Sequence, residues 1–348
     1  MSFAIAAGLP IQEVLRMPIT ATQPDFVQLT GQYRAELLAH CYRMLGSVHD
    51  AEDLVQETYL RAWRSYDNFE GRASLRTWLY RIATNVCLTA LESRSKRPLP
   101  SALGAPSDPD RPVGDAWEVP WLQPLPDAVL GTTPEDPAAT VTFRDSTRLA
   151  LVAALQHLPP RQRAVLILRD VLAWRAAEVA DLLDTTTAAV NSALQRARAQ
   201  LGAVAPTEDD VPELSDPDQR ALLERYAAAF ENNDMDALLG LLKQDAVWEM
   251  PPHLEWYIGS AAIVRLITTH CPAGPGDLRL VPTSANGQPA FGVYLRGDDG
   301  VFRAYQIQVL RTDGHQVDHA VVWFDLDLFP SFGLPMVHPA PGTTAVRR

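Results

Sequence analysis

The sequence has few cysteines and no long apolar run. The three cysteines, Cys41, Cys87 and Cys271, are far apart among the 348 residues. This spacing suits neither a disulfide framework nor a metal motif, so we expect a reducing compartment and buried, unreactive thiols. No apolar run approaches the ~20 residues that a membrane span needs. The N-terminus also lacks the basic start and cleavage site of a secretory signal. We therefore expect a cytoplasmic protein without a membrane anchor, a metal or a cofactor.

The chain also lacks a net positive charge. It carries 30 basic and 42 acidic residues, for a net charge of −12. These charges are uneven: residues 71–97 hold six basic residues and one acid, whereas residues 203–348 hold 10 basic and 20 acidic residues. Contact with phosphates depends on the local field, so residues 71–97 remain a candidate nucleic-acid surface. The acidic C-terminal part would oppose DNA binding.

Composition and periodicity divide the chain into helical parts, linkers and an α+β part. Residues 98–143 contain ten prolines and seven acids without a helical period, which is typical of a linker. In chain order, we expect a leader (1–25), an all-helical domain (26–97), a Pro-rich acidic linker (98–143), a helix-turn-helix domain (144–202), a second linker (203–215), an α+β domain (216–329) and a tail (330–348).

Helices and strands can be placed within these parts. The first helical domain is expected to have helices at about 26–45, 50–64 and 74–93, the first with Leu29 on its buried side and ended by Gly46. Pro160 should open a later helix. For the α+β domain, the patterns predict helices at about 218–232, 235–243 and 260–269, and strands at about 246–250, 278–284, 290–295, 302–311 and 317–324.

The helix expected at residues 50–64 has two distinct faces. Its apolar residues form a single stripe: Ala51, Leu54, Val55, Tyr59, Ala62 and Trp63. The opposite side shows Asp53, Gln56 and Glu57 beside an exposed Leu60. Two carboxylates and an amide at i, i+3 and i+4 form one patch, which suits a basic partner. An ordinary solvated face is the alternative.

The amino-acid sequence of this stretch and of the one that follows resembles that of a known family. DAEDLVQETYLRAW at residues 50–63, followed by ASLRTWLYRIATN at 73–85, closely resembles region 2 of bacterial extracytoplasmic-function (ECF) sigma factors. The resemblance covers about residues 26–97 and recurs, as region 4, between 144 and 201. The element order after residue 216 resembles SnoaL-like, cone-shaped α+β domains. The implied fold is multidomain: two all-α sigma domains, a region 2 helical bundle and a region 4 helix-turn-helix, followed by an α+β SnoaL-like domain.

The resemblance assigns roles to residues in region 2. Asp53, Gln56 and Glu57 match positions that dock on the clamp of the core polymerase. Promoter melting requires aromatic surfaces that stack unpaired bases and a basic track for phosphates. The residues implied for the −10 element are Phe69, Arg72, Arg76, Tyr80, Arg81 and Asn85. Trp78 is interpreted as a core residue, because aromatic positions on a helix are more often buried. For Tyr80 the core and the DNA contact are left equally open.

The last helix before residue 202 is expected to read duplex DNA. With Val190 and Leu194 turned inward and Thr186 as N-cap, the outer residues match the family's −35 readers. They are Asn191, Ser192, Gln195 and Arg196, with Arg198 available for phosphate. Two residues depart from the family pattern. Asn191 stands where Lys or Arg is common, and Asp184 replaces a turn glycine, which Asp tolerates because it accepts a positive φ.

The linker contains the apolar segment VPWLQPLPD at residues 119–127. Trp121, Leu122 and Leu125 are unusual in a solvated tether, so we expect a docking segment with Trp121 and Leu122 as its anchor. Incidental local packing is the alternative. In family relatives this linker threads along the polymerase cleft toward the exit channel, and its acidity would suit a basic channel.

Aromatic and polar residues of the α+β domain suggest a pocket. The predicted pocket residues are Trp248, His253, Trp256, Tyr257, Trp323 and Asp325. His253, His319 and Asp325 could act as acid/base groups, as an Asp or His pair does in SnoaL-type enzymes, but their spacing does not identify two of them as such a pair. Ligand sensing is a further alternative. A regulatory or interaction role is favoured over both.

Together these patterns predict an RNA polymerase sigma factor, not an enzyme. It would bind core RNA polymerase, recognise −35 and −10 elements and initiate transcription. The C-terminal domain would regulate this activity by packing on both sigma domains in the free protein. Two alternatives remain: a helix-turn-helix regulator acting without polymerase, and a SnoaL-type enzyme or ligand sensor fused to a DNA-binding module. A small-molecule ligand of the C-terminal pocket and a separate anti-sigma protein are further partners that the sequence leaves open.

Overall fold

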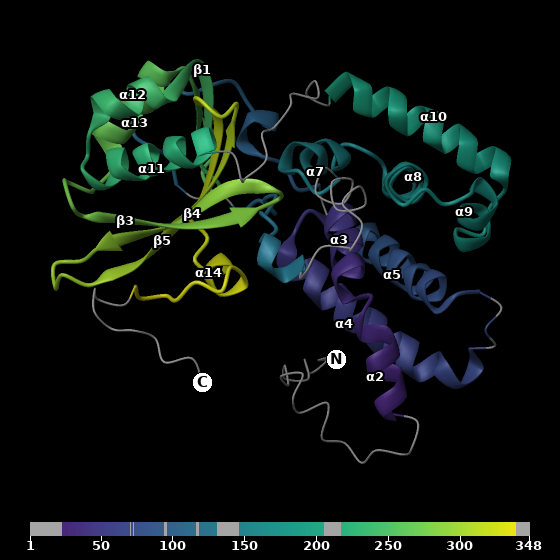
Figure 1. Cartoon of the computed structure of the whole chain (residues 1–348). Coiled ribbons are helices and arrows are strands. Elements are labelled where there is room, and N and C mark those ends of the chain that lie inside the picture. The colour runs from purple at the N-terminus through teal and green to yellow at the C-terminus, as the bar shows by residue number, and fades with distance from the viewer. Residues whose placement is uncertain are drawn as a thin grey trace, which may run out of the picture.

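The computed structural model describes residues 23–69, 71, 73–93, 96–115, 118–130, 146–204 and 217–338. Residues 1–22 of the predicted leader, Arg72, residues 131–143 of the first predicted linker, most of the second predicted linker and the end of the tail lie outside the described residues. Two groups of helices lie on one side of the molecule and a sheet domain lies on the other (Figure 1). Among the described residues, no helix is both long enough and apolar enough to cross a membrane.

The first helical group comprises α2 (Gln23–Gly31), α3 (Arg34–Leu45), α4 (Val48–Ser65) and α5 (Leu75–Glu92), with a short helix η1 (Tyr66–Asn68). The single helix predicted for residues 26–45 is wrong, because the chain breaks after Gly31 and restarts at Arg34. Gly46 ends α3 as predicted, with φ 70°, and its N–H donates to the Tyr42 carbonyl. The Ser47 hydroxyl then caps α4 by accepting from the Asp50 N–H at 3.1 Å.

The break in the first helix changes which residues it buries. Leu29 was expected on the buried side, but its side chain is 43% exposed. Phe26 is buried instead, and its ring meets Trp63 of α4 edge-on, with 5.3 Å between the centroids. The new start at Arg34 gives α3 its own phase, in which Leu37, Leu38 and Cys41 are buried.

The second helical group comprises α7 (Leu149–Leu155), α8 (Pro160–Leu166), a π-helical turn η4 (Ile167–Val171), α9 (Ala176–Leu182) and α10 (Thr187–Val204). Pro160 opens α8, as its tolerance for the first turn predicts. Asp184 adopts φ 50° in the turn before α10. The Thr186 hydroxyl accepts from the Ala189 N–H at 3.2 Å, which confirms the predicted N-cap.

The sheet domain comprises the helices α11 (Pro217–Glu231), α12 (Met235–Leu241), α13 (Ser260–His270) and α14 (Leu328–Ser331), and the strands β1 (Leu242–Glu249), β2 (Trp256–Ile258), β3 (Leu278–Ala285), β4 (Gln288–Arg296), β5 (Phe302–Thr312) and β6 (Val317–Trp323). The strand order is β2-β1-β6-β5-β4-β3. Only the β1–β6 pairing is parallel among these strands. The α+β architecture was predicted, but β2 and α14 were not.

The sheet has two apolar faces. On its inner face, Trp248, Phe291 and Val322 share one buried cluster with Tyr226 and other residues of α11–α13. On its outer face, side chains such as Ile307, Val309 and Trp323 belong to a second cluster, which also contains Tyr42 and Leu155 of the two helical groups. The sheet domain and the helices therefore share one hydrophobic core.

The linker runs between these parts and contributes to that core. It includes two short helices, η2 (Pro100–Ala102) and η3 (Asp127–Leu130). Leu122 and Leu125 are fully buried and Trp121 is 8% exposed, so the segment docks instead of remaining a solvated tether. The Leu122 carbonyl accepts from the Trp323 indole N–H at 2.7 Å, and the Gln123 N–H donates to the Gly46 carbonyl at 3.0 Å.

Asn286, in the β3–β4 turn, joins the linker to both helical groups. Its backbone N–H donates to the Leu125 carbonyl, and its side-chain oxygen accepts from the Leu125 N–H, both at 2.9 Å. Its side-chain nitrogen donates to the Tyr42 hydroxyl at 2.9 Å and to the Thr147 carbonyl at 2.6 Å. The residue is fully buried with φ 57°. One side chain thus satisfies polar groups from three separate segments.

We expect Asn286→Ala to lower the free energy of unfolding by about 2–4 kcal/mol, because it leaves buried donors and acceptors unpaired. Asn233→Ala is the matched control: Asn233 has φ 55° but is exposed, so its replacement isolates the left-handed backbone cost of about 1 kcal/mol. Urea unfolding followed by tryptophan fluorescence measures both. Equal losses in the two variants would show that the buried hydrogen bonds contribute nothing.

Candidate functional site

The acidic patch predicted on α4 lies on the surface. Asp53 and Gln56 are exposed, and Glu57 is partly exposed, next to a Leu60 that is 43% exposed. Glu57 accepts from Arg61, one turn along, at 2.7 Å. Such an exposed i,i+4 pair is weak, so an arginine of a partner can displace it. Of the apolar stripe on the other side of α4, Ala51, Val55 and Ala62 are buried, whereas Trp63 is 36% exposed.

Aromatic residues gather where α4 leads into α5. Phe69 lies 4.8 Å from the Trp78 ring and 6.4 Å from the Tyr66 ring, between centroids. Phe69 and Trp78 are both half-buried, so each ring keeps part of its surface open. Arg81 and Asn85 are exposed one turn apart on α5. This end of the first helical group therefore has open aromatic and polar groups of the kind that contact single-stranded DNA.

Tyr80 does not join that surface. The sequence left it open between a stacking face and the core; it is fully buried, and its ring meets Trp174 of the second helical group at 5.7 Å. Its hydroxyl donates to Glu36 at 3.1 Å, and burial together with the Glu36 charge raises the pKa of Tyr80. Arg76 also pairs with Glu36, at 2.6 Å, and lies over the Tyr80 ring. The second helical group thus covers Tyr80, whereas the Arg76 side chain is 40% exposed.

Two buried arginines hold the helical groups together. Arg163 of α8 donates to the Met44 carbonyl near the end of α3 and to the Gln156 side chain at 2.8 Å. Arg43 of α3 donates to the Ser146 carbonyl at 3.1 Å and its hydroxyl at 2.6 Å. Burial lowers the pKa of each arginine to about 10. The sequence analysis missed both, because nothing local distinguishes a buried arginine from an exposed one.

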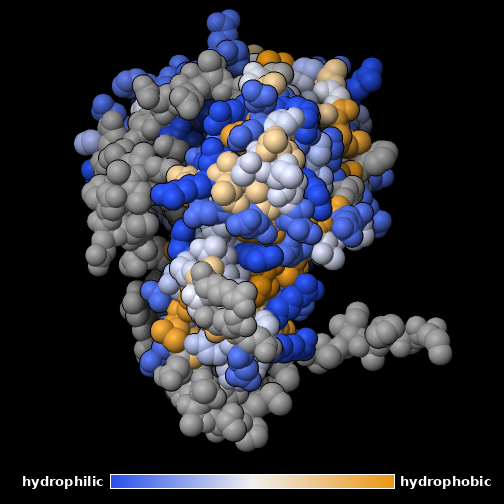
Figure 2. Space-filling view, turned by 90° about the vertical axis from the view of Figure 1, so that its right-hand side faces the viewer, coloured by the Kyte–Doolittle hydropathy of each residue, from blue (hydrophilic) through white to orange (hydrophobic). Residues whose placement is uncertain are grey.

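The outer face of α10 is open. Asn191, Ser192, Gln195 and Arg196 are exposed, whereas Val190 and Leu194 are buried, as the spacing predicted. Figure 2 shows this side of the molecule, and hydrophilic residues dominate its upper part, where α10 lies. Groups that can read base edges are thus exposed on one helix.

Arg198 is exposed, but its charge is already paired within the chain. Its guanidinium makes two hydrogen bonds to the Asp170 carboxylate, at 2.9 and 2.7 Å. These bonds raise the pKa of Arg198. Asp170 lies in the π-helical turn η4, outside α10. The ion pair therefore partly neutralises the charge that Arg198 presents on α10.

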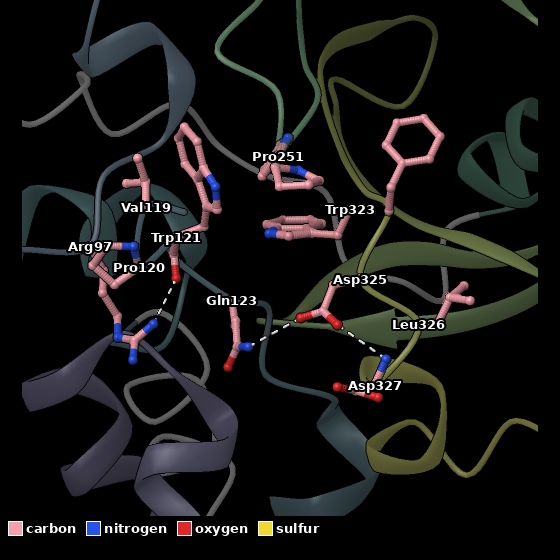
Figure 3. Close-up of a pocket in the computed structure, with 12 residues that line it drawn as sticks. Arg97, Val119, Pro120, Trp121, Gln123, Pro251, Trp323, Asp325, Leu326 and Asp327 are labelled. Atoms are coloured by element: carbon pink, nitrogen blue, oxygen red, sulfur yellow. Dashed lines mark hydrogen bonds between the residues drawn. The ribbon is translucent and has the colours of Figure 1, made fainter. Parts of the chain in front are cut away.

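The six predicted pocket residues do not line one cavity. Trp248 and Tyr257 lie in the inner cluster, where Trp248 stacks on Phe230 with 6.2 Å between centroids. Trp323 belongs to the outer cluster. Strand alternation explains the separation: Trp248 pairs with Ala320 on the inner face, and Trp323, three residues further along β6, points to the outer face. The prediction of one pocket for all six residues was wrong for this reason, although Trp323 and Asp325 line one cavity together (Figure 3).

The other predicted pocket residues hold the linker. The His253 Nδ1–H donates to the Gly114 carbonyl at 2.9 Å, and the Trp256 indole N–H donates to the Gly104 carbonyl at 3.0 Å. Asp325 accepts from the Gln123 side chain at 3.3 Å. None of these contacts is arranged for acid/base chemistry.

Further contacts fasten residues 101–110 to the sheet domain. The Ser107 N–H donates to the Trp256 carbonyl at 2.7 Å, and Asp110 pairs with Arg265 at 2.6 Å. Buried Glu249 accepts from the Ser101 N–H and from His319, both at 2.8 Å. Burial alone would raise the pKa of Glu249, but the hydrogen bonds and charge of His319, with the Ser101 N–H, outweigh it and lower that pKa. Glu249 is a linker-binding residue that the sequence analysis missed.

Comparison with known proteins gives the class of this architecture. Residues 29–97 match the family model of Sigma-70 region 2, and residues 148–201 match that of Sigma-70 region 4. The first and second helical groups are therefore the two sigma domains, in the order that the sequence predicted.

Relatives that match most of the chain show which family of sigma factors it belongs to. The chain is 56% identical over 323 residues to the ECF RNA polymerase sigma factor SigG of Mycobacterium tuberculosis H37Rv, covering 92% of this chain and 86% of that protein. It is 31% identical over 280 residues to SigJ of the same organism, covering 77% and 80%. The chain belongs to the ECF RNA polymerase sigma factors. As such it binds core RNA polymerase and promoter DNA, which confirms the main functional prediction.

A solved structure supports the arrangement of the whole chain. The crystal structure of the M. tuberculosis ECF sigma factor SigJ superposes with a TM-score of 0.58 at 25% identity, covering 89% of this chain and 99% of that one. The relatives are sigma factors, and the α+β C-terminal domain follows the sigma domains as expected.

We expect Asp170→Asn to free Arg198 and to tighten binding to a duplex of random sequence a few-fold. The slope of log affinity against log salt should steepen by about one, since one more cation reaches phosphate. Asp181→Asn is the matched control, because Asp181 is an exposed acid on α9 and the change in net charge is the same. Fluorescence anisotropy at several salt concentrations measures both. Identical behaviour of the two variants would rule out a specific role for the Asp170–Arg198 pair.

Proposed function

We propose that three surfaces divide the sigma-factor function. The α4 patch of Asp53, Gln56 and Glu57 docks on the polymerase clamp through charge-assisted hydrogen bonds. Phe69, Arg81 and Asn85 at the end of the first helical group hold the melted −10 strand. The exposed residues of α10 read the −35 duplex. Their exposure in the free chain supports this assignment.

We further propose that the free chain is closed and that the sheet domain keeps it closed. In B-DNA, elements named −35 and −10 are about 25 base pairs apart, or about 85 Å at 3.4 Å per pair. The two helical groups cannot span that distance while Tyr80 packs on Trp174 and Arg163 bonds the Met44 carbonyl. The groups must therefore separate before both elements are bound.

The observation that carries this proposal is the position of the linker. Its docked segment bonds the sheet domain through Leu122 and the first helical group through Gln123. A linker held in this way cannot thread along a polymerase cleft at the same time. Polymerase binding and the closed arrangement thus compete for the same residues, so the sheet domain restrains activity.

We also propose that the sheet domain performs no covalent chemistry and that the protein acts in the cytoplasm. The residues considered for acid/base work are engaged in structural contacts: His253 with Gly114, His319 with Glu249 and Asp325 with Gln123. This supports a regulatory role over the enzyme alternative.

Charge reversal of the α4 patch tests the polymerase contact. We expect Asp53→Lys with Glu57→Lys to weaken binding to the cognate core polymerase at least about tenfold, since charge-assisted bonds become repulsions. Glu224→Lys with Asp236→Lys makes the same charge change at exposed sites of the sheet domain and should leave affinity nearly unchanged. Titration of labelled chain with core enzyme gives both constants. Equal weakening in both double variants would disprove a local patch.

A second variant tests the closed state. Trp323→Phe keeps a ring in the outer cluster but removes the indole N–H that binds the Leu122 carbonyl. A hydrogen bond contributes about 0.5–1.5 kcal/mol, so opening should become about 3–10-fold easier and core affinity should rise by that factor.

Trp248→Phe is the control for this test. The same atoms are removed from the inner cluster, where the indole N–H has no hydrogen-bond partner among the described residues. Its core affinity should match that of the unmodified chain. A Trp323→Phe chain that binds core no more tightly than the Trp248→Phe chain would contradict restraint by the sheet domain.

A further inference from the structure

The outer side of α10 carries four polar side chains in two stripes. Residues four apart on a helix lie one turn apart on the same side, so Asn191 and Gln195 form one stripe and Ser192 and Arg196 form the next. All four side chains are exposed, and α10 lies at the outer edge of the second helical group (Figure 1). The two stripes therefore lie side by side on a surface that a duplex can reach.

The two stripes differ in the partners that they already have. The Arg196 guanidinium donates to the Ser192 hydroxyl at 2.7 Å, so the second stripe is partly paired within itself. Neither the Asn191 amide nor the Gln195 amide is hydrogen-bonded to another group in the described part of the chain. Each of these two side chains therefore keeps both an N–H donor and a C=O acceptor for a partner outside the chain.

The stripe of Asn191 and Gln195 is also neutral. An uncharged amide adds little to the attraction for phosphates, which every DNA sequence offers equally. It does have a donor beside an acceptor. Adenine is the one base whose major-groove edge has the same pair of groups, the N6 donor beside the N7 acceptor, so an amide can bind it through two hydrogen bonds. Unpaired amides on a helix that reads duplex are thus suited to base recognition.

The spacing of the two amides determines which base pairs they can reach. Four residues of an α-helix rise about 6 Å, and stacked base pairs are about 3.4 Å apart. Asn191 and Gln195 therefore reach neighbouring or next-but-one base pairs. Ala188, one turn before Asn191 on the same side, is exposed and short, so this end of α10 can approach the bases closely enough for an asparagine.

We propose that Asn191 and Gln195 specify two adenines of the −35 element. Each amide oxygen accepts from the N6 group of one adenine, and each amide N–H donates to N7 of the same base. The two adenines lie in neighbouring or next-but-one base pairs. This inference rests on the proposal that α10 reads the −35 duplex, and it names the bases and the residues that select them.

The first experiment recovers the sequence that each chain selects. Holoenzyme is assembled from the full-length chain and the cognate core polymerase, and bound molecules are recovered from a duplex library of random sequence. We expect the unmodified chain to select two such adenines, Asn191→Ala to lose selection of one, and Gln195→Ala to lose selection of the other. Gln200→Ala is the matched control. This exposed amide of the same helix donates to the His157 carbonyl at 2.9 Å, so its loss should leave both adenines selected.

The outcomes of this selection are distinct. Adenines that remain selected in both alanine variants are read through the shape of the duplex, and this result overturns the proposal. Weaker binding to every sequence with unchanged selection indicates a phosphate contact and also overturns it. Selection of other bases by Asn191 and Gln195 contradicts the pairing with adenine alone. If neither these variants nor Arg196→Ala changes any selected base, the proposed reading of the −35 element by α10 fails as well.

The second experiment identifies the atoms that are recognised. Each adenine of the recovered element is replaced in turn by 7-deazaadenine, which keeps its Watson–Crick pairing but lacks the N7 acceptor. We expect the holoenzyme to lose at least about fivefold in affinity at either position. With the Asn191→Ala chain, the loss should remain only at the adenine that Gln195 contacts, because a removed partner cannot be lost twice. Equal losses at both positions in the two chains overturn the pairing.

A third variant gives a positive result that a misfolded chain cannot give. Arginine pairs with O6 and N7 of guanine, so Asn191→Arg should change the selected base at its position from adenine to guanine. The adenine that Gln195 contacts should stay selected. Adenine retained at both positions by the Asn191→Arg chain overturns the assignment of Asn191.

Discussion

The arrangement of the whole chain depends on the backbone of the docked linker segment. A buried backbone needs partners for its N–H and C=O groups, and an extended segment has none of its own. Leu122, Gln123 and Leu125 find theirs on both neighbours: the Trp323 indole, the Gly46 carbonyl and the Asn286 amide. Removing either neighbour would leave buried polar groups unsatisfied. The linker therefore couples the first helical group to the sheet domain, because its buried backbone groups are all paired only when both neighbours are in place.

The interface between the helical groups has a different character, because it is built with buried cations. Arg43 and Arg163 donate mostly to carbonyl and amide oxygens, and their lowered pKa values reflect the desolvation of each charge. Buried charge stabilises less than an apolar contact of the same size, because its desolvation must be offset first. On opening, both guanidiniums regain water. An interface of this kind suits the proposed opening, because this rehydration offsets part of the cost of separating the two groups.

Local sequence patterns correctly predicted those elements whose burial or turn conformation depends only on residues nearby in the chain. The α10 periodicity placed Val190 and Leu194 inward correctly, and Gly46 and Asp184 marked their turns. Prediction failed where a distant segment decides burial. Tyr80 is covered by Trp174, which lies 94 residues later in the sequence. In the second half of β6, residues 320–323 are all buried, since helices cover one face of the sheet and the linker and helical groups cover the other. The alternation of buried and exposed residues is then lost, so the sequence does not indicate on which face of the sheet a residue lies. The predicted pocket combined residues of both faces for this reason.

Electrostatics connects the linker to both of its proposed locations. The linker carries seven acids and one basic residue, and the sheet-domain part of the chain is itself acidic. Two of the few basic side chains of that domain contact the linker: Arg265 pairs with Asp110, and the His270 ring donates to the Pro109 carbonyl at 3.1 Å. A channel built for nucleic acid is basic and offers the same acids many more cations. Exposed pairs such as Arg265–Asp110 are weak and screened by salt, so they hold the linker only until a stronger field competes. Under the proposed opening, the same acidity serves both the contact with the sheet domain and the contact with such a channel.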